Sequence, residues 1–319
     1  MHIVVTARDF STVEPGHAAL LRAAGHTVAD HSALGLGAGA DSAQVAALAA
    51  DADAVIAGLE PYPEAVLAAC PKLKMISRRG IGYDSVDTTA CRARGVTLAR
   101  TFGAVEGAVA EQVLAYILYF ARRLDAQNSL MQAGQWRRIQ TPGAKTRTLG
   151  LLGFGGIGKQ IALRAAPFGM RVLYSCRHPQ PEWDAQYGVE YCPAERLPAE
   201  CDYLSVNVPL TDETRGLCDA AFFSRMKPGS VFINIARGPV MDAAALRAAL
   251  DSGHLRGAAV DVYDREPCTD SPLVGCPAAL LTPHTASYTT ENFEAMNRIA
   301  ARNVLDWYAG RLPPANRVV

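Results

Sequence analysis

Residues 149–162 read LGLLGFGGIGKQIA: a short apolar run, a cluster of glycines and then a helical pattern. Gly153, Gly155 and Gly158 give the spacing G-x-G-x-x-G between the predicted strand and the predicted helix. The first glycine permits a tight turn, the second lets backbone approach a pyrophosphate, and the third lets the helix lie close on the strand. N–H groups at the helix start favour phosphate oxygens. The stretch predicts a dinucleotide site formed by Gly153, Phe154, Gly155, Gly156, Ile157 and Gly158.

The end of the next predicted strand indicates which dinucleotide is bound. Residues 172–179 read VLYSCRHP, at a distance from the glycines where an NAD site carries an Asp or Glu for the ribose hydroxyls. Ser175 holds that place, followed by Cys176 and Arg177. A hydroxyl does not repel a 2′-phosphate, and an arginine can bind one through two hydrogen bonds. We therefore expect NADP to be favoured over NAD; the alternative is that Arg177 points into solvent.

Strand patterns alternate with helical patterns along the chain, which is typical of parallel sheets covered by helices on both faces. Strands are predicted at 3–6, 54–58, 74–77, 149–152, 171–174, 202–208, 230–235, 257–262 and 280–282. Helices are predicted at 14–24, 42–51, 85–94, 105–124, 156–167, 241–252 and 290–309. The elements fall into one set before residue 98 and another from residue 149. The pattern predicts two doubly wound α/β domains, with the last helix returning to the first.

The charge balance argues against a polyanionic partner. Lys plus Arg and Asp plus Glu each number 31 among 319 residues, so neither nucleic acid nor a membrane is expected as a partner. The chain opens on the strand pattern MHIVV rather than on a signal peptide. The apolar stretch 108–121 contains Glu111 and Gln112 and is too short to span a bilayer. The eight cysteines have no zinc-binding spacing. We expect a cytoplasmic protein with reduced thiols and no metal.

Three polar residues follow late predicted strands, where loops of a parallel sheet line a ligand crevice. Arg237 ends FINIARG, Glu266 lies in VDVYDREP and His284 follows LLTP. Hydride transfer to a 2-keto acid needs a proton donor for the carbonyl oxygen, which suits His284. It also needs a cation for the carboxylate, which suits Arg237. Glu266 would orient the imidazole and favour its protonated form.

Taken in order, GFGGIG, VNVPLTDETRGL, MKPGSVFINIARGPVMD, AAVDVYDREP and LLTPHTAS resemble the motifs of the D-isomer-specific 2-hydroxyacid dehydrogenase family. The resemblance covers nearly the whole chain, from LKMISRRGIGYDSVD at 73–87 onward. It implies a flavodoxin-like substrate domain of residues 1–99 plus 287–319 and a Rossmann NAD(P)-binding domain of residues 100–286. It also implies an oxidoreductase that transfers a hydride between NAD(P)H and a small 2-keto acid or D-2-hydroxy acid.

The same resemblance implies roles for individual residues. The family's catalytic Arg, Glu and His fall on Arg237, Glu266 and His284. Its carboxylate-binding loop falls on RRGIGYD, with backbone N–H groups near Gly80, Ile81 and Gly82. Further cofactor contacts fall on Asn207, Val208, Pro209, Thr214, Ala236 and, at the nicotinamide, Asp261. Arg78 matches an arginine of D-3-phosphoglycerate dehydrogenases, which would suit a phosphorylated or otherwise acidic substrate.

Family members are commonly homodimers joined through the cofactor domains. This implies a contact made by helix 105–124 through Val109, Val113, Tyr116, Ile117 and Phe120; the alternative is a core helix within one chain. Phe102 and Val105 depart from the family's usual Pro and Asn, which leaves the shape of the substrate open.

VLYSCRHP resembles the NADPH-using glyoxylate/hydroxypyruvate reductases more than the other members of the family. We therefore expect an NADP-preferring reductase of small 2-keto acids. The alternatives are an NAD-dependent D-3-phosphoglycerate dehydrogenase and a nucleotide-sensing binding protein similar to the corepressors of the same superfamily.

Overall fold

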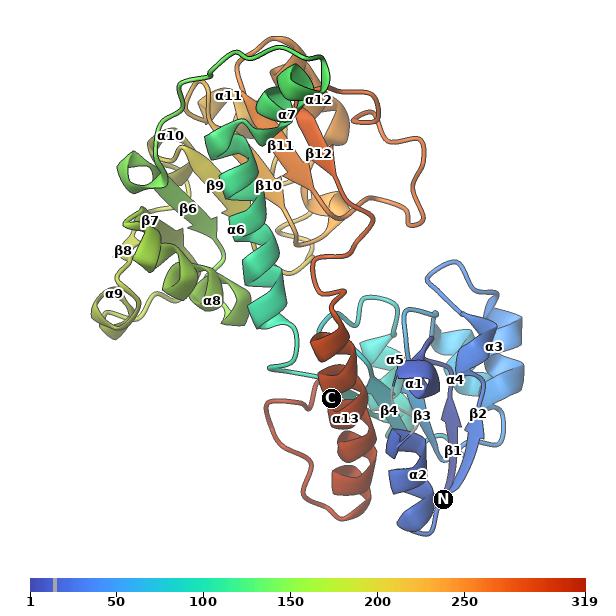
Figure 1. Ribbon diagram of the computed structural model, residues 1–319. Coiled ribbons are helices and arrows are strands. Elements are labelled where there is room, and N and C mark those ends of the chain that lie inside the picture. The colour runs from blue at the N-terminus through green and yellow to red at the C-terminus, as the bar shows by residue number, and fades with distance from the viewer. Residues whose placement is uncertain (14–15) are drawn as a thin grey trace. The chain divides into compact units, whose positions relative to one another are not determined.

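The computed structural model describes residues 1–13 and 16–319 and divides the chain into two compact units (Figure 1). Unit 1 comprises Met1–Val105 and Tyr288–Val319, and unit 2 comprises Glu106–Ser287. Each unit has its own parallel sheet. In the described part of the chain, no helix combines the length and apolar character needed to cross a membrane.

Unit 1 is built on a five-stranded parallel sheet in the order β2-β1-β3-β4-β5. This is the doubly wound strand order of flavodoxin-like domains. The strands are β1 (His2–Val5), β2 (Thr27–Asp30), β3 (Ala54–Ala57), β4 (Met75–Arg78) and β5 (Thr97–Arg100). The helices are α1 (Phe10–Val13), α2 (Gly16–Ala23), α3 (Ser42–Ala49), α4 (Glu64–Ala69), α5 (Thr88–Arg94) and α13 (Thr290–Tyr308), with a short 3-10 turn at Ser32–Leu34.

The C-terminal helix α13 belongs to the core of unit 1. It packs on β4 and α2. Ala300, Ala301 and Val304 lie in one apolar cluster with Ile3 and Val5 of β1. The two ends of the chain are therefore parts of one folded unit.

Unit 2 is built on a seven-stranded parallel sheet in the order β12-β11-β10-β9-β6-β7-β8. The strands are β6 (Thr148–Leu152), β7 (Arg171–Ser175), β8 (Glu190–Tyr191), β9 (Tyr203–Val206), β10 (Val231–Asn234), β11 (Gly257–Val260) and β12 (Ala279–Leu281). The helices are α6 (Glu106–Arg122), α7 (Leu124–Gln132), α8 (Gly156–Ala165), α9 (Glu182–Tyr187), α10 (Leu197–Glu200), α11 (Ala220–Arg225) and α12 (Ala243–Asp251). Short 3-10 turns lie at Ala144–Thr146, Ala166–Phe168 and Gly238–Val240.

The register of unit 2 brings the loops that carry the predicted site to one edge of the sheet. Leu152 of β6 pairs with Ser175 of β7 and with Val206 of β9, and Asn234 of β10 pairs with Val206 and with Val260 of β11. The chain order reverses at β6, because β7 lies on one side of it and β9 on the other. Such a switch point is where ligands bind in doubly wound sheets.

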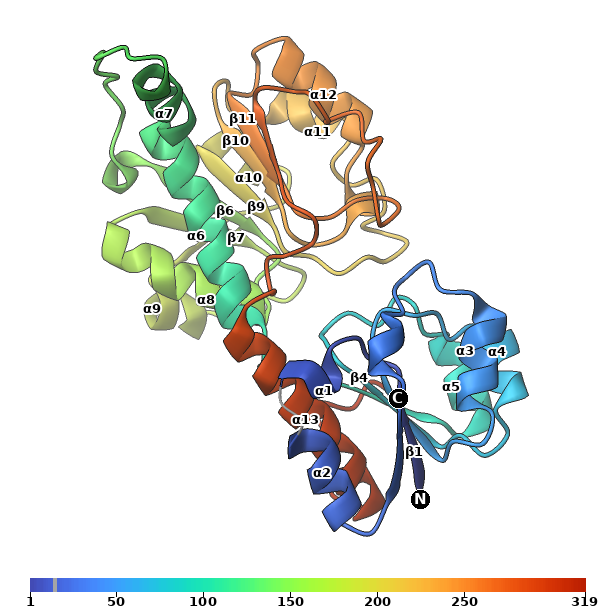
Figure 2. The ribbon, with the colours of Figure 1, turned by 45° about the vertical axis from the view of Figure 1, so that its right-hand side comes forward.

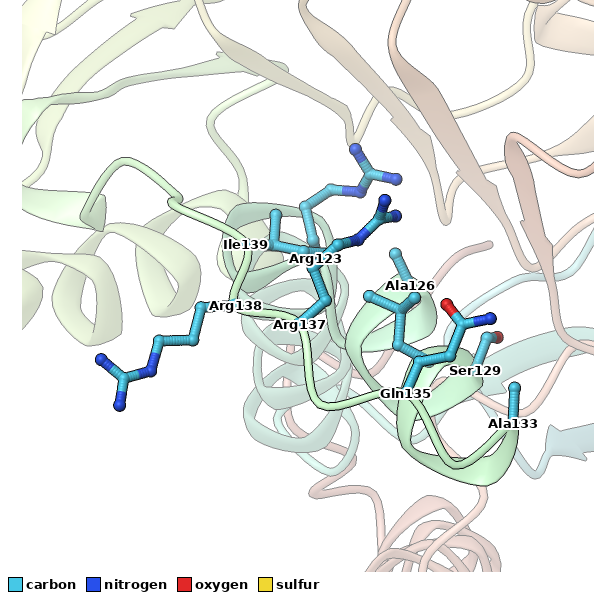
Figure 3. A pocket seen from close by; sticks show the side chains of 9 residues that line it. Arg123, Ala126, Ser129, Ala133, Gln135, Arg137, Arg138 and Ile139 are labelled. Carbon is cyan, nitrogen blue, oxygen red and sulfur yellow. The ribbon is translucent and has the colours of Figure 1, made fainter.

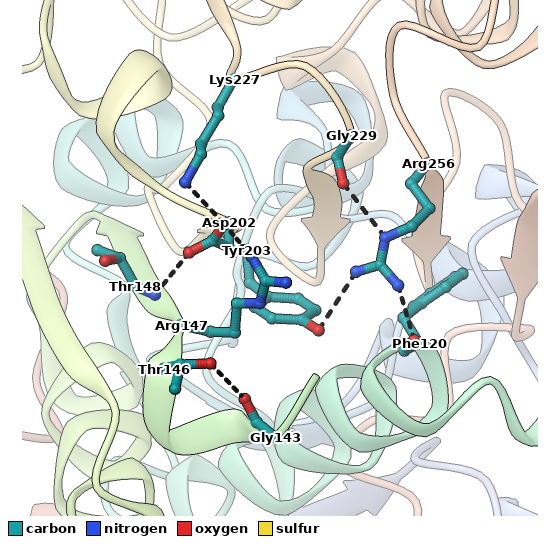
Figure 4. A network of polar contacts seen from close by, with 10 residues as sticks. All are labelled: Phe120, Gly143, Thr146, Arg147, Thr148, Asp202, Tyr203, Lys227, Gly229 and Arg256. Carbon is teal, nitrogen blue, oxygen red and sulfur yellow. Dashed lines mark hydrogen bonds and ion pairs between the residues drawn. The ribbon is translucent and has the colours of Figure 1, made fainter. Parts of the chain in front are cut away.

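At the opposite edge of this sheet, where the strands begin, a network of polar contacts connects neighbouring segments (Figure 4). Buried Asp202 accepts hydrogen bonds from the Thr148 N–H at 2.9 Å, from Arg147 at 3.1 Å and from Lys227 at 2.9 Å. Arg256 donates to the Phe120 carbonyl at 2.8 Å and to the Tyr203 hydroxyl at 3.3 Å. The network connects the starts of several strands to the C-terminal end of α6, away from the loops that carry the predicted site.

The apolar face of α6 lies in the core of unit 2. Val109, Val113, Tyr116, Ile117 and Phe120 are all at most 7% exposed. The helix packs on α8 and β10, and Figure 2 shows α6 running along the sheet beside α8. The prediction that this face forms a dimer contact is therefore wrong, and the alternative of a core helix within one chain is correct.

Every predicted strand and helix corresponds to an element of the structure, although residues 14 and 15 of the predicted helix 14–24 lie outside the described residues. The sequence patterns miss β2, β5 and β8 and the helices α1, α4, α7, α9, α10 and α11. Most of these are short elements, and a strand of two residues or a helix of four has too few positions to display a periodicity.

Candidate functional site

The glycine loop between β6 and α8 is tightly packed at its ends and open at its centre. Gly153 has φ of 100°, and a Cβ there would lie 2.8 Å from the backbone carbonyl of Asn207. A Cβ on Gly158 would lie 2.6 Å from the Gly153 oxygen, so both positions require glycine. A Cβ on Gly155 would meet nothing within 4 Å, and no side chain caps α8. The open backbone and the uncapped N–H groups fit a pyrophosphate.

Phe154, between the first two glycines, anchors the loop by packing against aromatic side chains of β7 and α9. It is 3% exposed, and its ring centroid lies 4.3 Å from that of Tyr174 and 5.4 Å from that of Trp183. Lys159 of α8 places its Nζ 4.0 Å from the Trp183 ring centroid. These contacts hold α9 against the start of α8. Gly156 and Ile157 form the first turn of α8 and are partly exposed.

The end of β7 contacts the glycine loop through Ser175 and is followed by the cation Arg177. Ser175 is 4% exposed, and its carbonyl accepts the Gly153 N–H at 2.8 Å. Cys176 is half-buried and Arg177 is exposed. Hydrogen bonds from Thr211 and from its own backbone, together with the Arg177 charge, lower the pKa of Glu213. Arg177 therefore lies within electrostatic reach of the loop after β9, where the sequence analysis did not single out Glu213.

The loop after β9 is held rigidly next to Gly153. The Asn207 N–H donates to the Leu152 carbonyl at 2.7 Å, while its side chain exchanges hydrogen bonds with Ser205. Thr214 Oγ1 donates to the Pro209 carbonyl at 2.7 Å and accepts from the Thr211 N–H at 2.8 Å. Val208 is half-buried, and Pro209 is exposed at the rim. The predicted cofactor contacts Asn207, Val208, Pro209 and Thr214 thus lie in the loop that follows β9, one of the two strands beside β6 at the switch point.

Arg237 is supported by a buried residue that the sequence analysis missed. Asn234, the last residue of β10, is fully buried; its Oδ1 accepts the Ala236 N–H at 3.0 Å and its Nδ2 donates to the Arg237 carbonyl at 3.0 Å. Arg237 Nη1 donates to the Ala236 carbonyl at 2.6 Å. The signal in the sequence was an amide among the apolar residues of FINIARG. Asn234 shapes the turn from which the Arg237 side chain extends.

Glu266 and His284 form a direct pair. Glu266 Oε2 lies 2.6 Å from His284 Nδ1, and Glu266 Oε1 accepts the Tyr263 N–H at 3.0 Å. Burial acts to raise the pKa of Glu266, but His284, the Tyr263 N–H and the Arg237 charge outweigh burial and hold that pKa below its ordinary value. The Arg237 guanidinium is therefore close enough to act on the same carboxylate. The structure brings together the three residues that the strand-end pattern predicts.

Asp261 organises the segment that carries His284. It is 1% exposed; its Oδ1 accepts the Thr282 hydroxyl at 2.5 Å and the Thr285 N–H at 2.8 Å. Its Oδ2 accepts the Ala286 N–H at 2.9 Å. A carboxylate has about four acceptor sites, so these contacts leave room for one further donor. The predicted nicotinamide contact thus shares its carboxylate with the loop on both sides of His284.

The predicted substrate residues lie in unit 1, at the end of β4. Arg78 is 9% exposed and donates to the Arg79 carbonyl. Gly80 has φ of 143°, and a Cβ there would collide with the Arg78 guanidinium. The backbone N–H groups of Gly80, Ile81 and Gly82 make no hydrogen bond within the described part of the chain. This loop can therefore offer several donors to an anion.

Two hollows of the described surface lie outside the glycine loop. One of about 620 Å³ lies between α7 and the segment after it (Figure 3), where the Arg138 side chain extends away from the other lining residues. A smaller one of about 160 Å³ lies beside Tyr263 and Cys268. Within residues 1–13 and 16–319, no cluster of three or more His, Cys, Asp or Glu side chains forms a metal site.

The sequence matches known proteins over most of its length. Residues 114–286 match the model of the D-isomer specific 2-hydroxyacid dehydrogenase, NAD binding domain. A glyoxylate reductase of Thermococcus litoralis is 36% identical over 253 residues, which are 76% of this chain and 76% of that protein. A D-3-phosphoglycerate dehydrogenase of Mycobacterium bovis is 36% identical over 279 residues, which are 86% of this chain. The match spans only 53% of the latter protein's length.

The fold is also that of solved structures. A glyoxylate reductase from Paecilomyes thermophila superposes with a TM-score of 0.88 at 26% sequence identity. The superposition covers 100% of this chain and 98% of the other. The two-unit architecture described above is therefore shared over the full length.

Proposed function

Because the chain belongs to the D-isomer specific 2-hydroxyacid dehydrogenase family, we propose that it reduces small 2-keto acids of the glyoxylate and hydroxypyruvate class, with NADPH preferred over NADH. Glyoxylate reductases are among its relatives in sequence and in structure. One observation carries the catalytic assignment: the Glu266–His284 pair at 2.6 Å, with the Arg237 charge acting on the same carboxylate. All three residues lie at the sheet edge that holds the glycine loop.

The two units take different tasks. Unit 2, Glu106–Ser287, serves as the NAD(P)-binding domain that the sequence suggests at residues 100–286, because the glycine loop, the switch point and the uncapped α8 N-terminus all lie in it. Unit 1, Met1–Val105 with Tyr288–Val319, serves as the substrate domain that the sequence suggests at residues 1–99 plus 287–319. The N–H groups of Gly80, Ile81 and Gly82 hold the substrate carboxylate, and the positive φ of Gly80 shapes this loop. Arg78 stands beside the loop, where a second acidic group of a substrate would meet a cation.

The reduction divides among three side chains. NADPH, when bound, supplies the hydride for the carbonyl carbon. Arg237 pairs with the substrate carboxylate and polarises the adjoining carbonyl. His284 uses Nδ1 for Glu266, so Nε2 is the nitrogen that gives a proton to the carbonyl oxygen. Glu266 keeps the ring oriented through its contact with Nδ1. The product is a 2-hydroxy acid, and His284 regains its proton from solvent.

The preference for NADPH rests on the end of β7. Ser175 and Cys176 bring no negative charge to the adenosine end of the site, and Arg177 supplies a cation there. Arginine matches the geometry of a phosphate better than lysine does. The remaining cofactor contacts are those of the glycine loop and of Asn207, Val208, Pro209, Thr214, Ala236 and Asp261.

The enzyme forms a homodimer through unit 2. Because the core of the unit buries the apolar face of α6, the contact uses other residues. α7 buries none of its residues, and Leu124, Met131 and Trp136 expose 50%, 54% and 81% of their surfaces. Exposed apolar side chains gathered on one segment commonly mark a protein contact.

A cytoplasmic location fits the eight free cysteines, which form no disulfide.

The test is the oxidation of NADPH by the purified protein with glyoxylate, hydroxypyruvate or 3-phosphohydroxypyruvate. We expect turnover with the first two and weaker turnover with the third. Preferred turnover of 3-phosphohydroxypyruvate with NADH would instead favour the D-3-phosphoglycerate dehydrogenase alternative, to which Arg78 and the mycobacterial relatives point. Nucleotide binding without turnover of any keto acid would favour the binding-protein alternative.

A further inference from the structure

A chain of hydroxyl groups connects α6 to the loop that carries His284. The Tyr116 hydroxyl of α6 lies 2.5 Å from Thr282 Oγ1, across 166 positions of sequence. Thr282 Oγ1 in turn donates to Asp261 Oδ1 at 2.5 Å. A threonine hydroxyl has one hydrogen, and here it goes to the carboxylate. Tyr116 must therefore be the donor to Thr282, so the direction of the chain is Tyr116 to Thr282 to Asp261.

This series of hydrogen bonds ends at Asp261, which binds the backbone on both sides of His284. Asp261 accepts the N–H groups of Thr285 and Ala286, while its third partner, Thr282, lies two residues before the histidine. His284 itself has φ of 54°, in the left-handed region that a residue with a side chain rarely occupies. Such a conformation persists only where the surroundings hold it. The three contacts of Asp261 supply that support.

Tyr116, at the other end of this series of hydrogen bonds, is a donor whose position is fixed by burial. The side chain is 2% exposed, and burial raises the pKa of its hydroxyl, so that Tyr116 stays protonated. The ring belongs to the core face of α6 and cannot swing away without opening the core. A second tyrosine, Tyr263, donates to the Thr282 carbonyl at 3.0 Å from the other side. Thr282 is therefore held through both its hydroxyl and its backbone.

We propose that Tyr116 is a positioning residue for the reaction, acting through Thr282 and Asp261 on the loop that carries His284. The inference rests on the proposed role of His284 as proton donor. Tyr116 does not touch substrate or cofactor in this assignment. Its hydroxyl keeps Asp261 in the orientation that places the imidazole, and small displacements of a reacting group cost large factors in rate.

The first experiment compares Tyr116→Phe with the wild type. We expect kcat to fall roughly five- to fiftyfold, while KM for the keto acid and the dissociation constant of NADPH change less than about twofold. Tyr203→Phe is the matched control, because Tyr203 is also buried in unit 2 and its hydroxyl is bound at the opposite edge of the sheet by Arg256 (Figure 4). The control should keep the wild-type kcat.

A second pair of variants covers the case in which Tyr116→Phe does not fold. Thr282→Ser keeps the hydroxyl and should retain most of kcat, whereas Thr282→Val removes the hydroxyl at nearly constant shape and should lower kcat as Tyr116→Phe does. The double variant Tyr116→Phe/Thr282→Val should be no slower than Thr282→Val alone, because both changes interrupt the same series of hydrogen bonds.

Three outcomes overturn the inference: wild-type kcat in Tyr116→Phe, an equal loss in Tyr203→Phe, or equal activity of the serine and valine variants of Thr282. The proposed function has its own test, since it fails if His284→Ala keeps full turnover. Loss of activity in His284→Ala with none in the Tyr116 and Thr282 variants would refute only the positioning role.

Discussion

Glu266 and His284, eighteen residues apart in sequence, are joined by a 2.6 Å contact between Oε2 and Nδ1. The contact determines which ring nitrogen is used inside the protein and which is left for a substrate. Because Arg237 also acts on Glu266, one carboxylate links the proposed proton donor with the proposed carboxylate-binding cation.

Replacement of His284 by alanine should lower kcat by about two or more orders of magnitude, the scale expected for the loss of a positioned acid. The dissociation constant of NADPH should change little. His254→Ala is a suitable control, because His254 is also half-buried in unit 2 but binds the Phe223 carbonyl at 3.1 Å. Arg237→Ala should raise KM in addition to lowering kcat. Near-full turnover in His284→Ala would disprove its assignment as proton donor.

The Glu266–His284 pair should make stability depend on pH. The pKa of Glu266 lies below its ordinary value of 4.5 in the folded protein. The ionised carboxylate therefore stabilises the fold above that ordinary value, and its contribution is lost as the pH falls through the lower folded pKa. We expect Glu266→Gln to reduce the free energy of unfolding at neutral pH and to differ less from the wild type in strong acid. Urea unfolding at both pH values measures this, and an equal difference at both would contradict it.

The wild-type enzyme should prefer NADPH over NADH by roughly ten- to a hundredfold in kcat/KM. This factor corresponds to the binding free energy of one charge-assisted hydrogen bond. Arg177→Ala should weaken NADPH and spare NADH, because only the 2′-phosphate uses the cation. Ser175→Asp should reverse the preference by placing a negative charge against the phosphate. Equal use of the two cofactors by the wild type would mean that Arg177 does not reach the phosphate.

Glu213 should oppose the preference for NADPH. The charge of Arg177 lowers the pKa of the Glu213 carboxyl. The Glu213 carboxylate should therefore compete with the 2′-phosphate for that cation. We expect Glu213→Gln to tighten the binding of NADPH several-fold at low salt and to leave NADH unchanged. Titration of each cofactor with the purified protein checks this. The effect should diminish at high salt, because both groups are exposed; equal tightening of NADH would refute it.

The protein should have twice the mass of one chain in dilute solution. Trp136→Ala with Met131→Ser should shift the mass toward the monomer, since these exposed side chains lie on and beside α7. Leu20→Ser provides a control, because Leu20 is 42% exposed on α2 in unit 1. A wild-type mass of one chain, measured by light scattering, would exclude the dimer.

Much of the architecture follows from local sequence. The alternation of strand and helix patterns predicts two parallel sheets, and LGLLGFGGIG predicts the loop that the structure shows between β6 and α8. Arg237, Glu266 and His284 could be grouped beforehand because each follows a strand, and parallel strands end at one edge. These inferences succeed because helix and strand periodicities, and the glycine positions of a tight turn, are contained in contiguous residues.

The contacts that support the candidate site follow from tertiary packing and not from any local pattern. No local pattern shows that the apolar face of α6 is buried within its own unit, since core and interface helices have the same periodicity. The three partners of Asp261, the support of Arg237 by Asn234 and the contact between Tyr116 and Thr282 depend on strand order and register. Those are set by packing between segments distant in the chain. Local sequence patterns therefore indicate most of the longer elements and the chemistry of the candidate site, whereas packing between distant segments sets which side chains hold that chemistry in place.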